Sequence, residues 1–86
     1  MRHHLEILEE LEKLLSDKGF NNELLQLKSE IAGSFTGTEL CLRCGSKLLT
    51  LKRSNRMFSS VASDLITEFI SYCHQNGLFP KPIYEA

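Results

Sequence analysis

Apolar side chains recur every three to four residues in four separate segments of this chain, and that period limits the possible folds more than any other feature. In each segment the apolar residues fall on one side of a helical wheel, and polar or charged residues fall on the other. The period predicts helices over 3–18, 21–33, 38–54 and 60–76. Because the connections between them are short, we expect a small all-α, antiparallel four-helix bundle, with one domain spanning 1–86.

Residues at the segment ends predict where the helices begin and stop. Gly19 and Gly77 each follow a segment and precede an apolar residue, which is typical of a stop where glycine is left-handed and the next side chain covers the last turn. Thr38 is the expected N-cap of the third helix, and Ser59 or Ser60 that of the fourth. These residues divide the chain into four short helices.

The third segment admits a second interpretation. Instead of one helix over 38–54, two strands could flank a Cys-x-x-Cys-Gly turn at 41–45. The helix is favoured because Leu48 and Leu49 would point to opposite faces of a strand and break its alternation. Gly45 opposes the helix, since glycine inside a helix costs about 1 kcal/mol relative to alanine.

Three cysteines carry the clearest chemical signal. Cys41 and Cys44 have the spacing of half a zinc site, and Cys73 with His74 could supply the other two ligands that a structural site needs. Adjacent helical residues point about 100° apart, which makes joint ligation by the second pair awkward. Thiol–disulfide exchange at Cys41 and Cys44 is a further alternative, although such pairs usually follow a strand. The favoured hypothesis is three small buried apolar side chains, with no metal and no cofactor.

Charge is unevenly distributed along the chain. Residues 1–33 hold four basic and seven acidic side chains, whereas residues 34–60 hold five basic and one acidic. The basic region 43–56 is therefore a candidate surface for nucleic acid or another polyanion. Its candidate anion-binding residues are Arg43, Lys47, Arg53 and Arg56. Aromatic side chains for base stacking are missing from this region, which favours a solvated face or a complement to the acidic first helix.

Several large apolar side chains lie outside the predicted helix faces. They occupy connections or the tail, which Pro80 and Pro82 keep extended. These candidate partner-binding residues are Phe35, Met57, Phe58, Phe79 and Tyr84. Exposed apolar groups mark surfaces that bind a partner or a second copy. We therefore expect a protein-interaction or self-association module, with anion binding through 43–56 and zinc or thiol chemistry as alternatives.

Other classes of function are not expected from this sequence. The chain has no phosphate-binding loop and no G-x-S-x-G motif, so we expect no enzyme. Apolar runs fall far short of the roughly 20 residues that a membrane span requires. An odd, small number of cysteines and an acidic amphipathic beginning predict a cytoplasmic protein.

Overall fold

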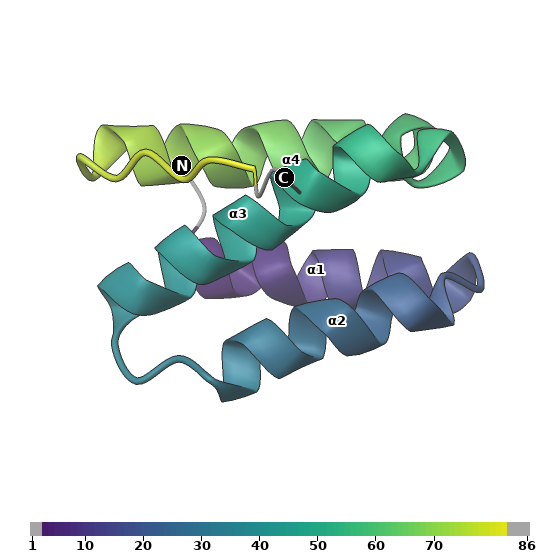
Figure 1. Ribbon diagram of the computed structural model, residues 1–86, viewed down its shortest axis with the longest axis horizontal. Helices are drawn as coiled ribbons and strands as arrows, with labels where there is room; N and C mark the ends of the chain where they lie inside the picture. Colours follow the sequence, from purple (N-terminus) through teal and green to yellow (C-terminus); the bar gives the residue numbers. More distant parts are fainter. Residues whose placement is uncertain (1–2, 83–86) are drawn as a thin grey trace.

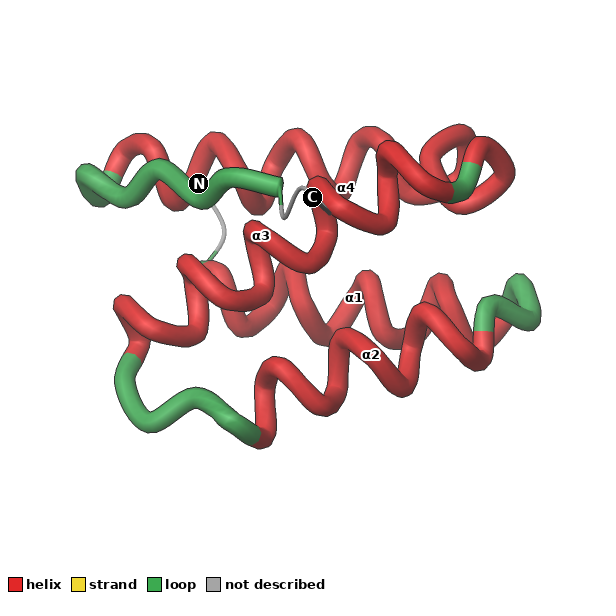
Figure 2. Tube along the Cα trace, viewed as in Figure 1, coloured by secondary structure: helices red, strands yellow, loops and turns green. Residues whose placement is uncertain are grey.

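The computed structural model describes residues 3–82, which form four α-helices and no strand. The helices are α1 (His4–Asp17), α2 (Asn21–Ala32), α3 (Gly37–Ser54) and α4 (Arg56–Gln75) (Figure 1). Helix accounts for most of the described trace, with short loops between the helices and a non-helical tail after α4 (Figure 2). The all-α fold predicted from the periodicity is confirmed, and the third segment is one continuous helix rather than a pair of strands.

The helices are arranged as an antiparallel bundle in which each helix packs against its neighbours in the order α1, α2, α3, α4 and back to α1. Consecutive helices run in opposite directions, and α3 crosses obliquely between α2 and α4 (Figure 1). No helix in residues 3–82 is long and apolar enough to cross a bilayer.

Leucine, isoleucine, cysteine and phenylalanine side chains from all four helices fill the core. The buried apolar residues are Ile7, Leu8, Leu11, Leu15, Leu27, Leu40, Cys41, Cys44, Leu48, Leu51, Phe58, Ala62, Ile66, Phe69 and Cys73. Phe58 is fully buried, and the Phe20 ring packs edge-on against it with centroids 6.0 Å apart. Since burying a side chain of this size contributes about 1.5–3 kcal/mol, these apolar contacts carry most of the stability.

The start of α4 corrects the sequence prediction. Asn55, rather than Ser59 or Ser60, is the N-cap, and its Oδ1 accepts a hydrogen bond from the Phe58 amide at 3.1 Å. The helix therefore begins at Arg56 instead of residue 60. Asparagine caps helices as well as serine does, so the earlier cap lengthens α4 by a full turn.

The start of α3 differs by a smaller amount. The Oγ1 of Thr36, not of Thr38, accepts a hydrogen bond from the Glu39 amide at 3.0 Å, so this helix begins at Gly37. The predicted stops of α1 and α4 are confirmed, because Gly19 and Gly77 have φ of 79° and 75°. In both stops the amide of the following apolar residue bonds back into the helix.

After α4 the tail turns back along α4 and α3 (Figure 1). Its Pro80 ring is buried against Gly45, where a Cβ would lie 2.6 Å from the proline Cγ. Gly45 thus provides the space for a close approach, which accounts for a glycine inside α3. Of the predicted tail residues, Tyr84 lies outside the described range.

Candidate functional site

The three cysteines all lie in the core. Cys41 is 2% exposed, and Cys44 and Cys73 are fully buried. Burial raises the pKa of Cys44 and of Cys73 to about 12, and it raises that of Cys41 as well. Because the thiolate is the form that attacks disulfides and binds metal, these thiols are poorly suited to either role near neutral pH. They pack as small apolar side chains instead.

The two ligands that could have completed a zinc site point in different directions. Cys73 faces the core, where its Sγ donates to the Cys41 carbonyl oxygen at 3.7 Å. His74 is exposed, and its ring stacks on Phe79 with centroids 5.1 Å apart. Within residues 3–82, no three His, Cys, Asp or Glu side chains come together as a metal-binding group.

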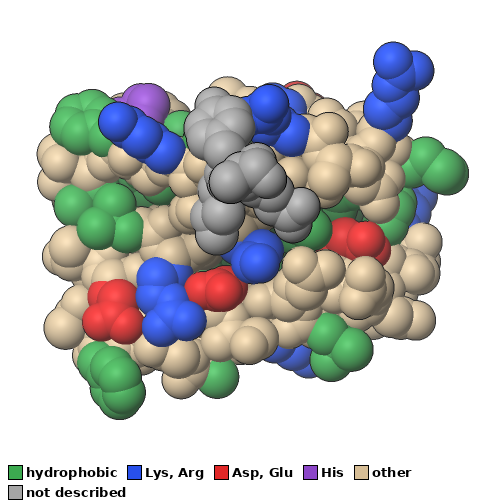
Figure 3. Space-filling model, in the orientation of Figure 1, with side chains coloured by type: hydrophobic (Ala, Val, Ile, Leu, Met, Phe, Trp, Pro, Cys, Tyr) green, Lys and Arg blue, Asp and Glu red, His purple; other side chains and the backbone are tan. Residues whose placement is uncertain are grey.

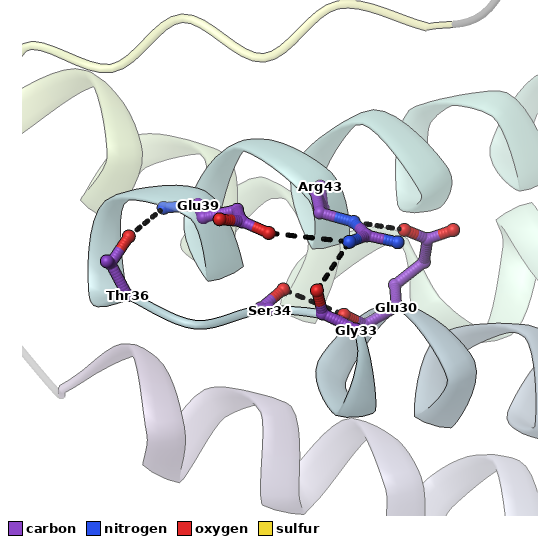
Figure 4. A network of polar contacts seen from close by, with 6 residues as sticks. All are labelled: Glu30, Gly33, Ser34, Thr36, Glu39 and Arg43. Atoms are coloured by element: carbon purple, nitrogen blue, oxygen red, sulfur yellow. Dashed lines mark hydrogen bonds and ion pairs between the residues drawn. The ribbon is translucent and has the colours of Figure 1, made fainter.

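Arg43 is directed toward carboxylates of its own chain. Its Nε donates to Glu30 Oε2 at 2.9 Å, and its Nη1 lies 3.4 Å from Glu39 Oε1 (Figure 4). The same Nη1 donates to the Gly33 carbonyl oxygen at 2.6 Å. The hydrogen bond to Glu30 is the main cause of the raised pKa of Arg43. Arg43 therefore joins the end of α2 to the start of α3. Among the other three candidate anion-binding residues, Lys47 lines a small hollow together with Arg43, but Arg43 does not line the larger groove that holds all three.

Those other three basic residues share one surface. Lys47, Arg53 and Arg56 line an open groove of about 890 Å³ where the start of α2 meets the α3–α4 corner. Met57 lines the same groove, as does one carboxylate, Glu23. The structure thus brings together three of the four basic candidates, next to an apolar side chain.

The candidate partner-binding residues have very different environments. Phe35 is 91% exposed, Met57 73% and Phe79 62%, so these three are available to a partner. Phe58 was expected in a connection, and this prediction is wrong because Phe58 is fully buried in α4. The physical reason is the cap at Asn55, which places Phe58 in the first turn of the helix with its side chain toward the core.

In the loop between α2 and α3, the residues on both sides of Phe35 make hydrogen bonds (Figure 4). Before it, the Ser34 hydroxyl donates to the Glu30 carbonyl oxygen at 2.7 Å. After it, Thr36 caps α3. Arg43 then binds the Gly33 carbonyl oxygen from the side. The backbone around the exposed ring is therefore held in one place by contacts to both neighbouring helices.

An apolar hollow of about 280 Å³ lies next to this loop. The apolar residues that line it are Leu5, Ile31, Phe35 and Leu40. His4 also lines the hollow, and its Nδ1 is buried without a hydrogen-bond partner among the described residues. A projecting aromatic ring beside an apolar hollow is typical of a protein-binding surface.

Sequence reasoning found Phe35 but missed the wall of this hollow. Leu5 is 52% exposed, and the apolar spacing within one helix does not show which other segments lie near it. Only the packing of α1 against the end of α2 brings Leu5 near the loop.

Comparison of the chain with protein-family models, with curated proteins and with solved structures finds no match.

Proposed function

We propose that this chain is a non-enzymatic protein-binding module in which Phe35 is the main contact residue for a partner. The observation that carries the proposal is a 91% exposed aromatic ring between two hydrogen-bonded residues. Binding through a side chain on an ordered loop loses less conformational entropy than binding through a flexible one. Large exposed apolar groups of this kind are enriched in the centres of protein interfaces.

The chemistry of the partner follows from the hollow. Its surface is mainly apolar, and its volume of about 280 Å³ suits one or two apolar side chains better than a typical small-molecule ligand. We therefore expect the partner to present an apolar side chain to the hollow while its backbone or a second apolar group covers Phe35. A cytoplasmic location is part of the proposal, and three unpaired cysteines support it.

Selection from a phage-displayed library of random peptides tests the proposal without a known partner. Peptides that bind the wild-type protein are measured against Phe35→Ala, with Leu25→Ala as the matched control, because Leu25 is 67% exposed and does not line the hollow. We expect Phe35→Ala to weaken the selected peptides by about tenfold or more, and Leu25→Ala to leave them unchanged. Peptides that bind both variants equally well would contradict the assignment of Phe35.

A further inference from the structure

A short apolar stripe runs along the outer side of α4. Met57, Val61 and Leu65 are spaced four residues apart, so they form one ridge on the helix surface. Met57 is 73% exposed and Val61 39% exposed, while Leu65 is half-buried. Leu65 packs partly against the core, but the core does not account for the exposed Met57 and Val61.

The two ends of the stripe border grooves of opposite charge. At one end, Met57 lines the groove of about 890 Å³ whose basic side chains are Lys47, Arg53 and Arg56 and whose one carboxylate is Glu23. At the other end, Leu65 lines a groove of about 670 Å³ along α1. The charged residues of this second groove are Glu6, Glu9, Glu10, Asp17 and Lys13. The surface thus changes from basic, through apolar, to acidic.

Such a surface is complementary to itself. Val61 lies midway between Met57 and Leu65, so a two-fold axis beside Val61 exchanges the two ends of the stripe. Met57 of one copy then packs on Leu65 of the other, and each basic groove faces an acidic groove. Ridges spaced by four residues interdigitate when two helices cross at about 50°, so the contact has an ordinary helix-packing geometry.

We propose that the chain forms a symmetric homodimer through the stripe of Met57, Val61 and Leu65, with the opposed grooves as its electrostatic contacts. A second copy of the chain covers all three parts of the surface at once. A nucleic acid in the basic groove would leave the stripe and the acidic groove exposed, which favours the second copy. This dimer surface does not include Phe35, so the inference is independent of the proposed function.

Charge reversal provides the first test, with oligomeric state measured by analytical ultracentrifugation. Lys47→Glu/Arg56→Glu makes both grooves acidic, and Glu6→Lys/Glu9→Lys makes both basic. Each variant alone is expected to dimerise at least about tenfold more weakly than wild type, because like charges then face each other. An equal mixture is expected to restore the dimer, since every opposed pair of grooves again has opposite signs.

The control for this test is Lys28→Glu, an exposed residue of α2 that lines neither groove, and it should dimerise like wild type. A circular-dichroism spectrum of each variant confirms that it is folded. Two outcomes would overturn the proposal: wild-type protein that stays monomeric over the whole concentration range, or a mixture that fails to dimerise although wild type does. Monomeric protein that binds RNA with steep salt dependence would assign the basic groove to nucleic acid instead.

Cross-linking at the two-fold axis provides a second test. Val61→Cys places a thiol of each copy beside the axis, so mild oxidation is expected to give a covalent dimer in which the mutant positions are linked. The native thiols interfere little because all three are buried. Leu25→Cys is the control, being exposed on α2 and outside the stripe. Cross-linking of Leu25→Cys at the same rate as Val61→Cys would contradict the proposed interface.

Discussion

Helix α3 presents Cys41 and Cys44 to the core and Arg43 to the α2–α3 loop, and its two sides stabilise the protein in different ways. On the inner side, apolar side chains are removed from water and packed closely against the core side chains of the other helices. On the outer side, an exposed guanidinium binds two carboxylates and a carbonyl oxygen (Figure 4). The same helix thus supplies packing on one side and positioning of a loop on the other.

The difference in energy between the two sides is large. Exposed ion pairs contribute about 0–1 kcal/mol each, because water and salt screen them. Basic and acidic side chains are also intermixed on the face that carries α2, α3 and the tail (Figure 3), as expected of a solvated surface. We conclude that the inner side determines whether the chain folds, whereas the outer side determines how the α2–α3 loop presents Phe35.

The largest expected difference in stability is between two phenylalanine substitutions, one in the core and one on the exposed loop. Phe58→Ala removes a fully buried ring and should lower the free energy of unfolding by about 3–5 kcal/mol. Phe35→Ala removes a ring that is 91% exposed and should change it by less than about 0.5 kcal/mol. Urea unfolding followed by circular dichroism measures both. A similar loss in the two variants would mean that Phe35 packs against the protein rather than pointing into solvent.

The buried thiols predict how stability depends on pH. The pKa of Cys44 and of Cys73 rises from 9.0 to about 12 on folding, so the native state keeps these protons where the unfolded state loses them. Their contribution to stability is therefore complete below pH 9 and is lost as the pH rises from 9 toward 12.

Urea unfolding at increasing pH measures this loss. Cys44→Ala is the matched variant, and its stability should decline less steeply above pH 9, although it starts lower because a buried side chain has been truncated. An equally steep decline in the variant would show that other groups account for the pH dependence.

Alanine substitutions at two glycines, Gly45 on the inner side of α3 and Gly33 beside Arg43, are expected to have smaller effects. Alanine at Gly45 gains about 1 kcal/mol of helix propensity, but its Cβ would lie 2.6 Å from the Pro80 ring, so the tail must move away. Alanine at Gly33 meets only the flexible Arg43 guanidinium, at 2.8 Å, which can rotate aside. We expect the amide NMR signals of Leu78, Phe79 and Lys81 to shift in Gly45→Ala and not in Gly33→Ala. Unchanged tail signals in Gly45→Ala would contradict the contact.

The helices and their stops were predictable because their signals are local. Apolar spacing and a left-handed glycine both depend on residues that are close in the sequence. Gly19 and Gly77 have the left-handed conformation that their positions predict. The start of α4 was mispredicted because Asn55 and the later serines are all acceptable caps, and burial of Phe58 decides between them.

The candidate site depended on contacts between distant parts of the chain. Arg43 reaches Glu30 from another helix, and Pro80 reaches Gly45 from the tail. Neither pair has a spacing that a single sequence reveals. The hollow beside Phe35 likewise exists only where α1 meets the α2–α3 loop. The exposure of Phe35 could be predicted from its place in a short connection outside the predicted helix faces, but the order of its loop could not.

Backbone ¹⁵N relaxation of residues 33–36 is the most direct test of the central claim, that Arg43 holds the Phe35 loop in place. In wild-type protein we expect order parameters of about 0.85, equal to those of the helices, and in Arg43→Gln values below about 0.6. The stability of Arg43→Gln should stay close to that of wild type, because the lost contacts are exposed and screened by water. Low order parameters in the wild-type loop, or a loop equally rigid in Arg43→Gln, would contradict the claim.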